Sequence, residues 1–233
     1  MPSAGNLPRT VGAAVAATLA LLGNAQAQPT AQGTLDLDAR LGFVEQRLDD
    51  QRLHSQLWQY GWTAVNGTGL VLGTYQAAST QNGDDRVVGI VDATKSVIGL
   101  TDLYFRPLPG LHGADPIRAM PGDTPEQQEE RLAAAERLLK ADAERAEERW
   151  GWAQHVGNLA VNLAGGAVIL GFGSKSSALT DTLIGLAAGE VQILSAPWEP
   201  VRSLGDYRSR FGGLAAAMEL RPRPGGLELA FHF

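Results

Sequence analysis

Residues 151–174 read GWAQHVGNLAVNLAGGAVILGFGS, a stretch with no Asp, Glu, Lys or Arg. A second stretch, residues 55–83, reads SQLWQYGWTAVNGTGLVLGTYQAASTQNG and is uncharged as well. A helix rises 1.5 Å per residue, so about 20 of these residues would cross a hydrocarbon core of about 30 Å. These two stretches decide the expected fold, because a helix that is apolar over such a length must bury its surface in lipid or in protein.

Each uncharged stretch is followed by a polar turn, at 81–84 and 173–176, and then by a second apolar segment, at 87–105 and 182–198. The two pairs of segments share markers, which predict an internal repeat. The markers are Trp58, Asn66, Gly73 and Pro107 in the first copy, and Trp150, Asn158, Gly165 and Pro200 in the second. The first three markers are 92 residues apart and the prolines 93. We therefore expect two equivalent helical hairpins, at 58–107 and 150–200.

The segment before the first hairpin, residues 28–57, reads as a polar linker followed by an amphipathic helix. From residue 36 onward, apolar residues such as Leu41, Val44 and Leu48 recur at steps of three and four. This spacing suits a short parallel coiled coil with a second copy of the chain, or a helix packed on its own domain. The second interpretation is favoured, because fewer than three clean heptads are present.

The segments between and after the hairpins have different compositions. Residues 108–149 form a Pro-rich loop and then a charged helix, for which Thr124 is a good N-cap and Pro125 suits the first helical position. Residues 201–233 form an Arg-rich segment and an expected C-terminal β-hairpin, because residues 227–233 alternate with period two.

The first 27 residues have the composition of a secretory signal peptide. A basic residue, Arg9, precedes the uncharged run 10–23, and Ala25 and Ala27 occupy the positions expected before a cleavage site. The run is shorter than a membrane span. We therefore expect export to a bacterial cell envelope, with the inner membrane favoured and the outer membrane or the periplasm as alternatives.

Composition and motifs exclude several classes of function. The 233 residues carry a net charge of −6 and no Cys, so neither nucleic-acid binding nor a thiolate metal site or Cys nucleophile is expected. No nucleotide-binding or hydrolase motif is present. The four histidines lie far apart and lack the spacing of metal ligands. We expect no catalytic residues, no metal and no cofactor, and the chain is not expected to be an enzyme.

Three architectures compete for this pattern. The favoured one is mainly α: two duplicated apolar hairpins that form a membrane-embedded four-helix bundle, with the flanking helices and the β-hairpin outside it. An outer-membrane β-barrel is the second, supported by the signal peptide and a C-terminal strand that ends in Phe233. A soluble periplasmic helical bundle is the third. The short turns carry no excess of positive charge, which argues against the first.

Polar residues within the apolar segments are the candidate site. Lys95 and Glu190 each lie near the middle of a segment, so we expect them to form a buried pair. Amide and carboxyl groups are expected to make contacts between helices, where they can find partners. These residues are Asp92, Asn66, Asn158 and Asn162.

The expected function is that of an exported membrane protein of the cell envelope with a structural, assembly or partner-binding role. Its partners would be membrane lipid, a second copy of the chain through residues 36–57, or another envelope protein. One alternative is a small oligomeric transporter, in which Lys95, Glu190, Asp92 and the asparagines line a polar path between the repeats. A barrel pore and a soluble periplasmic bundle are further alternatives.

Overall fold

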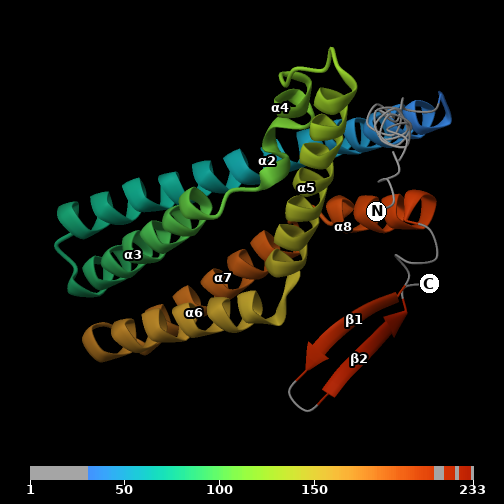
Figure 1. Ribbon diagram of the computed structural model, residues 1–233. Helices are drawn as coiled ribbons and strands as arrows, with labels where there is room; N and C mark the ends of the chain where they lie inside the picture. Colours follow the sequence, from blue (N-terminus) through green and yellow to red (C-terminus); the bar gives the residue numbers. More distant parts are fainter. Residues whose placement is uncertain (1–30, 213–217, 224–225, 232–233) are drawn as a thin grey trace, which may run out of the picture. The chain divides into compact units, whose positions relative to one another are not determined.

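A computed structural model describes residues 31–212, 218–223 and 226–231 (Figure 1). The expected signal peptide, residues 1–27, lies outside the described residues. The described part is mainly α, as the sequence predicted. Its elements are α2 (Ala31–Ser79), α3 (Gly83–Phe105), the 3₁₀ helix η1 (Pro109–His112), α4 (Asp115–Arg118), α5 (Pro125–Trp150), α6 (Trp152–Phe172), α7 (Lys175–Leu194), α8 (Glu199–Phe211), and the strands β1 (Met218–Arg223) and β2 (Gly226–Phe231).

Helix α2 is longer than the sequence pattern suggested. It runs for 49 residues and joins the expected amphipathic helix to the first arm of the first hairpin without a break. No proline interrupts these residues, and the glycines within them lie in a helical backbone. The segment after residue 201 also differs from the expectation, since its Arg-rich part is the helix α8.

Two helical hairpins follow from the polar turns. In the first, Asn82 accepts a hydrogen bond from the N–H of Asp84 and caps α3. In the second, Ser174 caps α7 in the same way through the N–H of Ser177. The arms of the first hairpin approach closely at Gly73, where an added Cβ would lie 2.8 Å from the carbonyl oxygen of Gly89. Glycine is needed there because any side chain would meet backbone.

A second region, which we call the head, is built from residues 37–55 of α2 together with α4, α5 and α8. Helix α5 begins where expected, with a capping box between Thr124 and Gln127 and with Pro125 in its first turn. The core of the head is apolar, and its fully buried side chains include Leu48 and Leu139. The core comprises Leu41, Val44, Leu48, Ala114, Ile117, Leu132, Ala135, Leu139 and Tyr207. The apolar face at Leu41, Val44 and Leu48 is therefore covered by the chain's own helices, in agreement with the favoured interpretation and not with a coiled coil between two copies.

The four apolar segments between residues 55 and 198 are helical, so the prediction that they are strands of a β-barrel is wrong. Within the described residues, α6 alone is long and apolar enough to cross a bilayer by length and composition. The expected four spans are thus not evident from hydropathy alone.

The two strands near the C-terminus form an antiparallel pair. Leu220 lies opposite Leu229, and Arg223 lies opposite Gly226. Helices occupy the described chain from residue 31 to residue 212, with no strand among them.

Candidate functional site

The hairpin region, which comprises residues 57–79 of α2 with α3, α6 and α7, presents apolar side chains to its surroundings. Apart from Leu53, every large hydrophobic side chain that is exposed among the described residues belongs to this region. Tyr104 and Phe172 are each 79% exposed, and Leu163 is 54% exposed. Some polar side chains of the same helices are buried instead, among them Ser96 at 8% and Asn162 at 5% exposure, which is unusual beside so many exposed apolar groups.

A cavity of about 920 Å³ lies between the two hairpins. Helix α3 contributes one polar stripe to it, at Asp85, Asp92, Ser96, Gly99 and Asp102. Steps of seven, four, three and three residues keep this stripe on one face of the helix. It extends for about 26 Å by helical rise. The cavity therefore has a row of polar groups on α3 within a lining that also includes apolar side chains, such as those of Val88 and Ile98.

The middle of the cavity holds an ion pair between Lys95 and Asp181. The Lys95 ammonium donates a hydrogen bond of 2.5 Å to Oδ2 of Asp181, and the two side chains are 16% and 8% exposed. Lys95 passes close to the backbones of Gly165 and Gly185, where an added Cβ would lie 3.3 and 3.2 Å from Nζ. The absence of side chains at these two glycines leaves room for Lys95.

The expected pair of Lys95 with Glu190 does not form. Glu190 accepts a hydrogen bond from Nδ2 of Asn158 at 2.9 Å and lies 2.7 Å from Nδ1 of His155. The sequence pattern placed the start of this arm at residue 182, but α7 begins at Lys175. Asp181 is therefore inside the helix, two and a half turns before Glu190, and it is the acidic residue level with Lys95.

The three asparagines lie between helices, and each packs against a glycine of the neighbouring arm. Asn66 lies against Gly99, Asn158 against Gly189, and Asn162 against Gly185. Nδ2 of Asn158 donates to the carbonyl oxygen of Leu186 at 3.1 Å, across the second hairpin. Asn66 donates to the carbonyl oxygen of Trp62 within its own helix at 2.9 Å. Asn66 and Asn158 are two of the repeat markers, so the two hairpins use equivalent asparagines in the same kind of contact.

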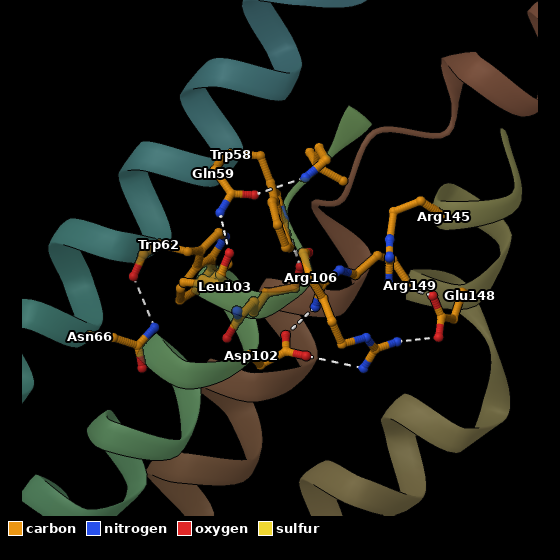
Figure 2. A network of polar contacts seen from close by, with 12 residues as sticks. Trp58, Gln59, Trp62, Asn66, Asp102, Leu103, Arg106, Arg145, Glu148 and Arg149 are labelled. Carbon is orange, nitrogen blue, oxygen red and sulfur yellow. Dashed lines mark hydrogen bonds and ion pairs between the residues drawn. The ribbon is translucent and has the colours of Figure 1, made fainter. Parts of the chain in front are cut away.

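A polar network closes the cavity next to the head, and Figure 2 shows its members. The guanidinium of Arg149, only 4% exposed, donates to Asp102 and to the carbonyl oxygen of Arg106. It also lies 5.1 Å from the ring centre of Trp58. Nearby, Gln59 donates to the carbonyl oxygen of Leu103 at 2.9 Å. These contacts join α2, α3 and α5 at the point where the hairpins leave the head (Figure 2).

The tips of the hairpins are tied together by Asp84. Its carboxylate accepts hydrogen bonds from the N–H of Ser174 at 2.7 Å and from the hydroxyl of Ser177 at 2.6 Å. One residue of α3 thereby completes the N-terminal cap of α7. Sequence reasoning missed Asp84, because the residues that it joins are about 90 positions apart.

The head holds a buried carboxylate of its own, Asp142, which is 1% exposed. It accepts hydrogen bonds from the N–H of Gly110 at 3.0 Å and from Nε2 of Gln51 at 2.7 Å. Burial raises the pKa of Asp142 to about 6, although both hydrogen bonds act in the opposite direction. Oε1 of Gln51 has no hydrogen-bond partner. After rotation of the amide, this oxygen can accept a hydrogen bond from the O–H group of protonated Asp142.

The arrangement does not resemble a catalytic centre with a nucleophile and a base. Among the described residues, no three His, Cys, Asp or Glu side chains gather where a metal ion could bind. Two acidic groups of the cavity are paired with cations of the chain itself, Asp181 with Lys95 and Asp102 with Arg149.

No protein-family model, no curated protein and no solved structure matches this chain.

Proposed function

We propose that the chain is an exported membrane protein of the cell envelope whose hairpin region inserts into a bilayer and provides a polar path for small hydrophilic solutes. The observation that carries this proposal is the combination, in the hairpin region, of many exposed large apolar side chains with a cavity that holds the ion pair of Lys95 and Asp181. Exposing such a surface to water would be costly, at roughly 25 cal/mol for each Å². In a bilayer the same apolar surface can contact lipid chains directly and does not have to be buried by protein.

The low hydropathy of three of the four helices is compatible with insertion. A helix that lines a polar cavity must carry polar residues on one face, and these lower its average hydropathy without touching lipid. On α3 the polar residues of the cavity lie in one stripe, whereas Ile90 and Val97 are exposed and do not line the cavity. The exposed surface, rather than the whole helix, decides whether lipid is tolerated.

Aromatic side chains near both ends of the hairpins support this orientation. Tyr60, Tyr104 and Trp152 are exposed near the head, and Tyr75 and Phe172 are exposed near the tips. Tyr60 and Tyr75 are about 22 Å apart along α2, and Trp152 and Phe172 about 30 Å apart along α6. Trp and Tyr concentrate at the two interfaces of a bilayer with about this separation.

The assembly role that the sequence also suggested has less support. It relied on an apolar face of residues 36–57, and the head covers that face with α5 and α8. The charged side chains of α5 pair along the helix, as Lys140 does with Glu144 and Arg145 with Glu148. These pairs are typical of a face in contact with water.

Cysteine labelling tests the insertion directly, because the chain has no Cys of its own. Leu163→Cys would place a thiol on the apolar exterior of α6, and Glu144→Cys is a control of similar exposure in the head. In sealed vesicles whose heads face outward, a membrane-impermeant maleimide should label Glu144→Cys but not Leu163→Cys. After solubilisation and denaturation both should react. Equal labelling in sealed vesicles would show that the hairpins face water and would contradict the proposal.

Passage of solutes is tested on the same vesicles. Loaded with a small fluorescent or radioactive solute, vesicles that contain the native chain should exchange it faster than protein-free vesicles. Ser96→Phe would fill the cavity from α3, where Ser96 is 8% exposed, and should slow the exchange. Thr101→Phe is the matched control, because Thr101 is exposed on the same helix. If the two variants exchange solute at the same rate, the cavity is not the path.

A further inference from the structure

The cluster in the middle of the cavity is not balanced in charge. Asp92 and Asp181 are close enough for their carboxyl groups to interact, and Lys95 is the cationic side chain that both of them face. When both carboxyl groups are ionised, two carboxylates and one ammonium leave one negative charge without compensation. In a partly buried place such an excess favours the uptake of a positive ligand.

Asn162 provides an independent sign of a missing donor. The residue is 5% exposed, and its Nδ2 donates to Asn158, but its Oδ1 has no hydrogen-bond partner. A buried carbonyl oxygen without a donor is costly. This oxygen lies beside Gly185, the glycine that Lys95 Nζ also approaches, so it points into the charged cluster.

The chemistry of these groups favours a ligand that donates hydrogen bonds. All the free positions are oxygen atoms, and the cation already bound there, the Lys95 ammonium, is an N–H donor. With two acidic residues the cluster lacks the carboxylates that a divalent metal usually needs. A cavity of about 920 Å³ leaves space for a ligand larger than a bare ion.

We propose that Asp92, Asn162 and Asp181 bind one small ammonium-type cation beside Lys95, so that the polar path selects small cationic amines. This inference rests on the proposed function for its physiological meaning, but the binding itself does not require a bilayer. Lys95 then has a double role: its ammonium neutralises Asp181 and limits the site to a single additional charge.

The test is thermal unfolding of the full chain in detergent micelles, titrated with methylammonium chloride. Sodium chloride and choline chloride at the same ionic strength are the references. Methylammonium should raise the Tm of the native chain in a saturable way, by about 3 to 6 °C at a tenfold excess over its Kd. Choline carries no N–H group and should not.

Three variants separate the site from a general effect of charge. Asp92→Asn should abolish the response, and Glu144→Gln, which removes the same charge from an exposed position of α5 in the head, should keep it. Lys95→Met should bind methylammonium about tenfold more tightly, because it removes the like charge beside the site. Damage to the fold would not tighten binding.

The inference is overturned if methylammonium stabilises the native chain no more than choline does, or if Asp92→Asn responds like the native chain. A response to sodium equal to that of methylammonium would overturn the assignment to ammonium-type ligands. A positive result here combined with equal cysteine labelling in vesicles would instead retain the binding site and refute the membrane path.

Discussion

The head and the hairpin region solve the problem of burying apolar surface in opposite ways. In the head, Leu48 and Leu139 are fully buried, and charged side chains such as those of Lys140 and Glu144 are exposed. In the hairpin region, Leu163 and Leu170 are exposed, whereas Lys95 and Asp181 are largely enclosed. One chain therefore contains two regions that are suited to different surroundings.

The difference shows that apolar content alone does not set which face of a helix turns inward. Helices α5 and α6 are consecutive, and only Gly151 separates them. Under the proposed function, the head would lie in water and the hairpin region in a bilayer. We therefore expect substitutions in the two regions to change the free energy of unfolding by different amounts.

The largest effect is expected from a cavity in the head. Leu139→Ala removes a fully buried side chain from the core and should lower the free energy of unfolding by about 2 to 5 kcal/mol. Leu170→Ala, at a position 53% exposed in the hairpin region, should change it by less than about 0.5 kcal/mol in detergent. Chemical unfolding followed by circular dichroism compares the two. Equal losses would mean that the leucines of the two regions are buried to the same extent.

The next effect depends on pH and arises in the head. Because the pKa of Asp142 is raised from its ordinary value of 3.8 to about 6, the native state favours the protonated form. The stability from this group is fully present below pH 4 and is lost as the pH rises through 6, by about 3 kcal/mol in total.

Asp142→Asn should remove this pH dependence and stabilise the chain at pH 7, since an amide is neutral and Gln51 can rotate to accept from it. Asp206→Asn, at an exposed position of α8, is the control. The measurement is the difference in Tm between pH 4.5 and pH 7. If Asp142→Asn keeps the pH dependence of Tm that the native chain shows, the effect belongs to another titratable group.

A smaller effect is expected from the glycines of α2. Gly73→Ala would place a Cβ 2.8 Å from backbone atoms of α3 and should destabilise by about 1 to 3 kcal/mol. Gly67→Ala meets no atom within 4 Å and should stabilise by about 0.5 to 1 kcal/mol through helix propensity. The two substitutions should change the free energy of unfolding in opposite directions. Unfolding curves of both variants therefore test whether the arms of the hairpin are in close contact at Gly73.

The smallest effect concerns the tyrosine that links α8 to the core of the head. The hydroxyl of Tyr207 donates to Glu136 and accepts from Nε of Arg40, and burial raises its pKa to about 12. Tyr207→Phe should cost about 1 kcal/mol, because Arg40 and Glu136 can still pair with each other. Tyr60→Phe, at an exposed position, should cost nothing measurable. A loss of more than about 3 kcal/mol would mean that the hydroxyl holds the whole network.

Local signals in the sequence identified the long helices and the N-terminal cap of α5. Thr124, Pro125 and the polar turns act over three or four residues, so they can be read without tertiary information. The asparagines were selected as contacts between helices because an amide in an apolar segment needs a partner. A regular spacing in the head was missed. The buried residues Leu41, Val44 and Leu48 lie 91 positions before Leu132, Ala135 and Leu139, and Gln51 lies 91 before its partner Asp142.

The choice of partners could not be read from the sequence. Lys95 binds Asp181 and not Glu190, because the start of α7 and the approach of α3 to α6 decide which carboxylate is level with the ammonium. Asp84 and Arg149 had no distinguishing pattern, since a charge on a helix reads the same whether it meets water or a distant helix.

The sequence by itself determined where the apolar segments lie, where they turn, and that they are helices, because these properties depend on neighbours within a few residues. Only the tertiary structure decided that the apolar side chains of the hairpins face outward and that Lys95, Asp92, Asp181 and Asn162 meet in one cavity. Those properties depend on contacts between residues far apart in the chain, and periodicity gives the face of a helix but not what that face will meet.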